Sequence, residues 1–182
     1  SQDSAVSVFY SFSDSEVIEA PFDQLKIESE SRNYGFNFAM PLYKANGTSF
    51  SFNTGLTLKD SDSFLLGEPF SFSVGAIEGE SKTTVLEFGG AFVHRAAAEV
   101  IAVSLTLRKG LDALDANTSA NDNIPDAEFT SFLSQAQYAR RIEALPGSQL
   151  IVRSALQYSL DPLLSIEKFS VGGHSSVRGY RE

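Results

Sequence analysis

The feature that most constrains this chain is the alternation of apolar and polar residues, with a period of two, over segments of strand length. Residues 34–42 and 50–58 each place large apolar side chains on one face and small or polar ones on the other. Such alternation is typical of β-strands with two different faces. Between them, Asn46-Gly47 favours a tight hairpin turn, because both residues tolerate positive φ. The sequence therefore predicts an all-β, antiparallel fold.

About nine segments of this kind follow one another, most of them separated by turn-forming residues. Residues 96–99 could instead begin a helix, although β-branched residues follow at once. The predicted segments are residues 5–12, about 22–30, 34–42, 50–58, 70–76, about 83–93, about 98–108, 132–142 and 150–160.

Two kinds of β-fold fit this pattern. No apolar run reaches the roughly 18 residues of a membrane-spanning helix, since Glu99 interrupts the most apolar one, residues 96–107. A closed β-barrel nevertheless crosses a bilayer with alternating strands, apolar side chains outside and polar ones inside. A soluble β-sandwich alternates too, with the apolar face as its core. Alternation alone leaves both open: a transmembrane barrel, or a sandwich acting as a carbohydrate-binding or adhesion module.

Charged residues indicate which face would line a barrel. An Arg that faces the lipid midplane destabilises a barrel by about 2–4 kcal/mol, whereas an Arg that faces a watery lumen costs little. The face of residues 150–160 that carries Arg153 is therefore predicted to point inward, and Arg153, Gln157 and Asp161 form a candidate polar wall of the lumen. The formal net charge of -9 argues against a nucleic-acid partner, which requires a basic surface.

The sequence offers little for catalysis or metal binding. Gly173-His174-Ser175-Ser176 lacks the second Gly of a hydrolase nucleophile motif, because Val177 stands in its place. Two His and no Cys make a zinc site improbable. The acidic residues between 109 and 127 could bind calcium loosely, but they lack the EF-hand spacing and fit a solvated loop better. We therefore predict no enzyme activity, no catalytic residue, no cofactor and no metal.

The Gly-rich last stretch has its own physical logic. Gly172, Gly173 and Gly179 allow sharp turns or close approach to a wall. Arg178 offers a rigid fork of five donors, and inside a lumen it would need an acidic partner. Asp161 is one such acid, and Val177 and Tyr180 would pack beside the guanidinium. The set of candidate residues is Gly172, Gly173, Val177, Arg178, Gly179 and Tyr180.

Val-Arg-Gly-Tyr at residues 177–180, preceded by Gly-Gly and two serines, resembles the signature of the outer-membrane protein-assembly and two-partner secretion superfamily. Residues 175–182, together with Ile-Glu-Lys-Phe at 166–169, are most similar to its haemolysin activation and secretion branch, the ShlB/FhaC/HecB-like proteins. The resemblance implies that a long extracellular loop folds into a sixteen-stranded barrel and carries the tetrad at its tip. There it would anchor or gate the pore, with Arg178 bound to an Asp on a later strand.

The resemblance also implies a function. POTRA domains in the periplasm recognise an unfolded exoprotein, which passes outward through the barrel without ATP, so the partners would be this exoprotein and the lipid of a Gram-negative outer membrane. The alternative within the superfamily is a factor that assembles other barrels. Residues 1–182 would form strands about 3 to 11 and the start of the motif loop, without the POTRA domains and later strands. Turns 44–47, 78–81 and 109–127 would then lie outside, and turn 144–148 in the periplasm.

Overall fold

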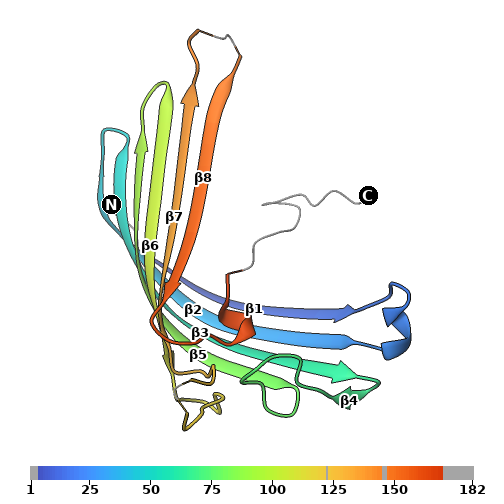
Figure 1. The fold of residues 1–182 in the computed structure, drawn as a ribbon. Helices are drawn as coiled ribbons and strands as arrows, with labels where there is room; N and C mark the ends of the chain where they lie inside the picture. The colour runs from blue at the N-terminus through green and yellow to red at the C-terminus, as the bar shows by residue number, and fades with distance from the viewer. Residues whose placement is uncertain (1–3, 122, 145–146, 170–182) are drawn as a thin grey trace.

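The computed structural model describes residues 4–121, 123–144 and 147–169, and most of them belong to one antiparallel sheet (Figure 1). Its long strands pair in the order β1-β2-β3-β5-β6-β7-β8, and β4 pairs with β3. The predicted all-β, antiparallel fold class is confirmed. The elements are β1 (Ala5–Glu16), 3-10 helix η1 (Phe22–Leu25), β2 (Glu28–Ala45), β3 (Thr48–Leu65), β4 (Glu68–Pro69), β5 (Glu80–Arg95), β6 (Glu99–Leu111), β7 (Thr130–Arg141), β8 (Gln149–Ser159) and 3-10 helix η2 (Ser165–Glu167).

The sheet has eight strands, where the sequence pattern predicts about nine segments. Predicted segment 22–30 is instead η1 followed by the start of β2, which runs unbroken for 18 residues. Predicted segment 70–76 is a loop, and residues 59–65 are strand. The polar starts and ends of these strands pair with one another, as Glu30 does with Asp62, so strand continues where the apolar period has stopped.

This difference changes where the turns lie. The short turns at residues 46–47, 96–98 and 142–148 share one end of the sheet, and the loops 17–27, 66–79 and 112–129 share the other. Turn 44–47 therefore lies with turn 144–148, and the prediction that separated them is wrong. Counting residues 70–76 as a strand inverted the direction of every earlier strand. The hairpin itself is as predicted, with φ of 50° at Asn46 and 75° at Gly47.

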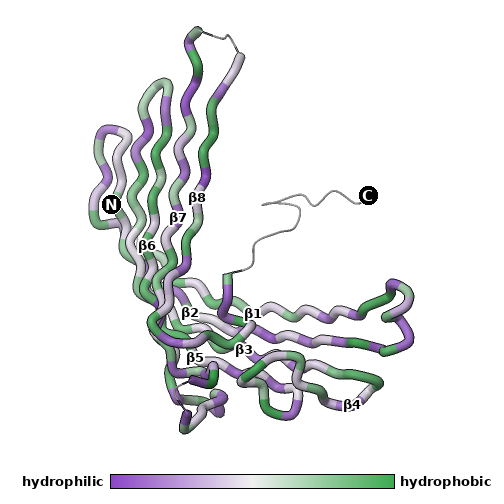
Figure 2. The backbone as a smooth tube through the Cα atoms, viewed as in Figure 1, coloured by the Kyte–Doolittle hydropathy of each residue, from purple (hydrophilic) through white to green (hydrophobic). Residues whose placement is uncertain are grey.

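The two faces of the sheet differ as a barrel wall requires. Figure 1 shows a strongly curved sheet, and Figure 2 shows hydropathy alternating along its strands. One face carries the row Val8, Phe36, Leu56 and Leu86 in direct register, and Val8 is 79% exposed. Within the described residues a single sheet leaves this apolar face uncovered, so the two-layer sandwich alternative does not fit.

The apolar band on this face has a sharp boundary. It ends near Tyr10 and Tyr34, whose ring centroids lie 5.0 Å apart. In β3 the band runs from Phe50 to Leu58, about 26 Å along the strand at roughly 3.3 Å per residue, close to the ~25 Å band of outer-membrane barrels. Beyond it the same face carries two charged rows, Arg32–Asp60–Lys82 and Glu30–Asp62–Glu80. In the part of the chain that the structure describes, no helix has the length and apolar character needed to cross a membrane.

Asn117 in loop 112–129 completes a free edge of β5. The pairing of β5 with β6 begins at Thr84, so residues 80–83 have no strand partner on that side. Lys82 N donates to Asn117 Oδ1 (2.8 Å), Asn117 N donates to Lys82 O (3.0 Å), and Asn117 Nδ2 donates to Glu80 O (3.0 Å). One buried residue, through its side chain and its backbone N–H, thus continues the ladder where β6 has ended.

The two neighbouring residues Leu156 and Ala155 test this assignment of faces. Leu156 is 66% exposed on the apolar face, whereas Ala155 pairs with Gln135 on the concave face. We expect Leu156→Arg in the whole protein to destabilise the barrel, lowering its free energy of unfolding in the membrane by about 2–4 kcal/mol. Ala155→Arg should change this free energy little. Urea titration of folding into lipid vesicles measures both values. Equal losses from the two variants would contradict the assignment.

Candidate functional site

The chain turns back onto the concave face directly after β8 (Figure 1). Asp161 makes this turn: its Oδ2 accepts a hydrogen bond from Thr130 N (2.7 Å), and its backbone carbonyl accepts one from Ser159 Oγ (2.7 Å). Asp161 is thereby tied to the first residue of β7 and is exposed at the end of the sheet. The residues that follow, 162–169, cross the concave face; we refer to them as the return segment.

Apolar contacts seat the return segment. Leu163 forms a parallel bridge with Asp126, and Leu164 is fully buried. Phe129 and Val85 are also completely buried, and both belong, with Leu163, to one hydrophobic cluster. A Cβ at Gly75 (φ 90°) would lie 2.0 Å from Pro125 O and 2.6 Å from Leu164, so the loops 66–79 and 112–129 close tightly around the segment.

Glu167 is the polar centre of this arrangement. Its side chain is fully buried, and each of its oxygens has partners. Oε1 accepts a hydrogen bond from Thr83 Oγ1 (2.7 Å) on β5. Oε2 binds Lys59 Nζ (3.1 Å) on β3 and is also bound by the guanidinium of Arg108 on β6. Three strands of the wall thus converge on one carboxylate of the return segment.

Arg108 connects this carboxylate to a second one. Its Nε donates to Glu87 Oε1 (3.0 Å), and its Cζ lies 5.9 Å from the ring centroid of Phe129, within cation–π range. Two cations and two carboxylates therefore balance, which is the condition under which charges tolerate burial. We call the five residues Lys59, Thr83, Glu87, Arg108 and Glu167 the Glu167 cluster.

Gln157 on β8 holds the backbone of the return segment. Its Nε2 donates to Glu167 O (2.8 Å), and its Oε1 accepts from Phe169 N (2.6 Å). On the opposite wall, Lys59 Nζ donates to Ile166 O (3.4 Å). The predicted polar-wall residue Gln157 thus lies on the concave face and contacts the return segment from the far side of the cluster.

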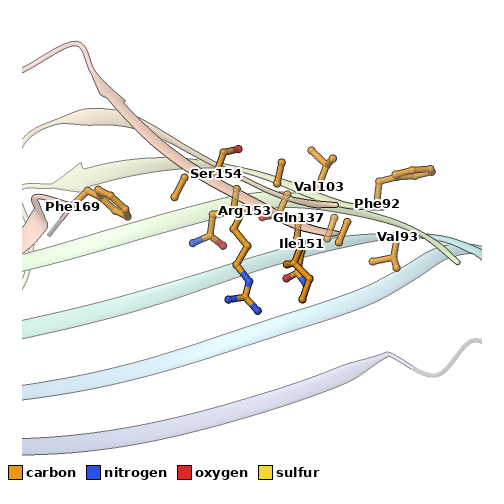
Figure 3. Close-up of a pocket in the computed structure, with 14 residues that line it drawn as sticks. Phe92, Val93, Val103, Gln137, Ile151, Arg153, Ser154 and Phe169 are labelled. Atoms are coloured by element: carbon orange, nitrogen blue, oxygen red, sulfur yellow. The ribbon is translucent and has the colours of Figure 1, made fainter. Parts of the chain in front are cut away.

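The other predicted residues lie apart from the Glu167 cluster. Arg153 pairs with Gln137 on the concave face, and both line an open hollow of about 890 Å³ that Phe169 borders on one side (Figure 3). The side chain of Arg153 extends away from the strands (Figure 3). The residues of the Gly-rich motif lie outside the described residues: Gly172, Gly173, Val177, Arg178, Gly179 and Tyr180.

Sequence reasoning missed the Glu167 cluster, although part of its signal is visible. Glu87 and Arg108 fall on the small, polar face of predicted segments, as Arg153 does, and Lys59 continues the polar face of residues 50–58 by one residue. The lipid argument that turns Arg153 inward turns these three inward as well, and it leaves two cations with one carboxylate. Glu167 lies outside the alternating segments, so no periodicity marks it as their partner.

One group of acidic residues has the chemistry for a hard cation. Carboxylate oxygens of Asp60, Asp62 and Glu80 lie within 4.8 Å of one another. Glu80 also forms an ion pair with Lys82. The acidic residues of loop 112–129 that the structure describes form no such group.

Leu164→Ala tests whether apolar burial seats the return segment. Truncating a fully buried Leu costs about 2–5 kcal/mol, and the loss should fall on the segment itself. We expect faster amide hydrogen exchange over residues 163–169 of the protein in detergent, with β2 and β3 unchanged. Leu160→Ala is the matched control, because Leu160 is 61% exposed. Unchanged exchange in Leu164→Ala would show that the segment does not depend on this contact.

Comparison with known proteins agrees with this architecture. The chain is similar to CdiB from Acinetobacter baumannii, with a TM-score of 0.69, 18% sequence identity, 96% of this chain covered and 30% of that chain. At this identity the likeness concerns the fold, and the chain spans about 30% of the length of CdiB. No curated protein sequence matches significantly. Residues 3–182 match the family described as haemolysin secretion/activation protein ShlB/FhaC/HecB. The chain therefore belongs to this family of two-partner secretion transporters, and its sheet is part of an outer-membrane β-barrel.

Proposed function

We propose that the protein is the outer-membrane pore through which a two-partner secretion system exports a large exoprotein. The observation that supports this most is the return segment: a sheet with an uncovered apolar face holds a piece of its own chain on the polar, concave side. That arrangement suits a pore whose passage is narrowed from within. The protein would act in a Gram-negative outer membrane, with lipid around it and the exoprotein as its partner.

The concave face suits the passage of an unfolded polypeptide. Away from the Glu167 cluster most of its side chains are small or carry amides, such as Asn37, Asn53, Ser104, Gln135 and Gln137, while Phe9 and Ile151 are large apolar exceptions. The small and amide side chains keep the lumen hydrated and limit the apolar surface on which a chain would stick. The family resemblance implies passage without ATP, so direction would come from the exoprotein itself, delivered by POTRA domains and folding outside.

In a sixteen-stranded barrel whose motif loop follows the eleventh strand, the seven long strands described here would be the fifth to the eleventh. All three long loops then lie outside the cell and all three short turns in the periplasm, which is the usual asymmetry of outer-membrane barrels. The return segment would be the start of the motif loop. Arg178, Gly179 and Tyr180 at its tip would anchor or gate the passage.

Loss of the protein separates export from barrel assembly. In cells that lack it, the partner exoprotein should fail to reach the medium, while the amounts of other outer-membrane barrels stay constant. Immunoblots of medium and of outer-membrane fractions measure both. A general fall in barrel proteins would favour the assembly function of the superfamily over export.

The role of the motif is tested at its Arg. Arg178→Ala should reduce exoprotein secretion at least tenfold. Arg178→Lys should secrete little more than Arg178→Ala, because Lys lacks the two-pronged geometry for a carboxylate. Arg181→Ala, three residues further on, is the matched control. Heat-modifiable migration on gels shows that each barrel has folded. Secretion at the normal level from a folded Arg178→Ala barrel would remove the motif from the mechanism.

A further inference from the structure

We infer that Glu167 is a positioning residue of the pore: it fixes the start of the inward loop to the barrel wall, and this attachment persists while a polypeptide passes. The inference rests on the proposed export function and deepens it. It adds a second attachment of the loop, separate from the one that the family resemblance assigns to the Gly-rich motif.

The attachment spans a broad arc of the wall. Glu167 binds side chains on β3, β5 and β6, and its backbone carbonyl accepts a hydrogen bond from Gln157 on β8. Four strand spacings of about 4.8 Å separate β3 from β8, roughly 19 Å of wall. A single residue reaches both sides because the sheet curves around it (Figure 1).

Charge balance makes Glu167 the closing member of its cluster. Lys59, Glu87 and Arg108 belong to the sheet, and only Glu167 comes from the return segment. Without its carboxylate, two cations face Glu87 alone. Among the cluster's ion-pairing side chains Glu167 is the most deeply buried, with 0% exposed against 24% for Lys59 and 10% for Arg108. The docked segment is therefore the state in which the charges of the wall are neutralised.

The attachment is also independent of the tip. Leu163 and Leu164 seat the same segment in an apolar pocket beside Phe129. Arg178 lies eleven residues beyond Glu167 in the sequence, so the two attachments are separate along the chain. The attached part of the loop extends at least to Phe169, whose N–H donates to Gln157 Oε1.

A charge-balance experiment in the whole protein tests the positioning role. Glu167→Gln keeps the shape of the side chain but leaves one uncompensated cation. We expect hydrogen exchange over residues 163–169 to accelerate on the order of tenfold or more, and secretion to fall, while the barrel stays heat-modifiable. Adding Lys59→Met removes the surplus cation, so the double variant should regain protection and secretion. Glu128→Gln, at an exposed Glu, is the matched control.

A disulfide distinguishes positioning from any other role of Glu167. Ser73 Oγ and Ser165 Oγ lie 3.1 Å apart, so Cys at both positions can join the return segment to loop 66–79. The 182 residues contain no Cys that would compete. In the Glu167→Gln background the oxidised Ser73→Cys/Ser165→Cys bond should restore secretion, and reduction should abolish this rescue. In the otherwise unchanged protein, oxidation should leave secretion unaltered.

Each result has a definite meaning. Normal exchange in Glu167→Gln, or failure of the disulfide to rescue it, overturns the positioning role. If the oxidised disulfide blocks secretion from the otherwise unchanged protein, the inference of a fixed attachment is overturned, because the return segment must then leave the wall during export. If secretion never depends on the protein, the proposed function fails instead, while the exchange measurement still decides whether Glu167 positions the segment.

Discussion

An ionised side chain is costly in hydrocarbon and cheap in water, and this difference sorts the residues of the whole sheet. Lys59, Glu87, Arg108 and Arg153 all lie on the concave face. On the apolar face of β2, β3 and β5, charges begin only beyond Tyr34 and Leu58, where the band ends. The same cost explains why backbone groups must pair from strand to strand across the lipid, and hence why the chain forms a curved sheet.

Charged side chains that point into the lumen avoid the cost of contact with lipid. Once a segment of the chain covers them there, however, they need partners of opposite charge. The return segment supplies the missing carboxylate in Glu167. Buried ion pairs contribute little net stability compared with apolar packing, but removal of one member is expensive. Here that asymmetry serves specificity: Leu163 and Leu164 supply apolar burial, and the Glu167 cluster fixes which position on the wall the segment takes.

The all-β class and the Asn46-Gly47 hairpin could be predicted because each follows from a local pattern, and the same period puts Arg153 and Gln157 on one face of their strand, which is the concave face of the sheet. The sequence pattern misassigned residues 22–30 and 70–76. Strands continue through polar ends that lack the apolar alternation, and a loop can contain apolar residues that alternate as a strand does. The Glu167 cluster could not be completed from periodicity. Its members are 108 residues apart at the extreme, Lys59 to Glu167, and only the return of the chain after Asp161 brings them together.

The pairing of Asn117 with β5 has a consequence for the proposed passage of a polypeptide. An unfolded polypeptide carries unpaired N–H and C=O groups, and an exposed strand edge is a template onto which it can add as an extra strand. Where β6 stops short, Asn117 already occupies the backbone groups of Glu80 and Lys82. In the proposed pore, an emerging chain would find these backbone groups already paired and could not add to the sheet as an extra strand.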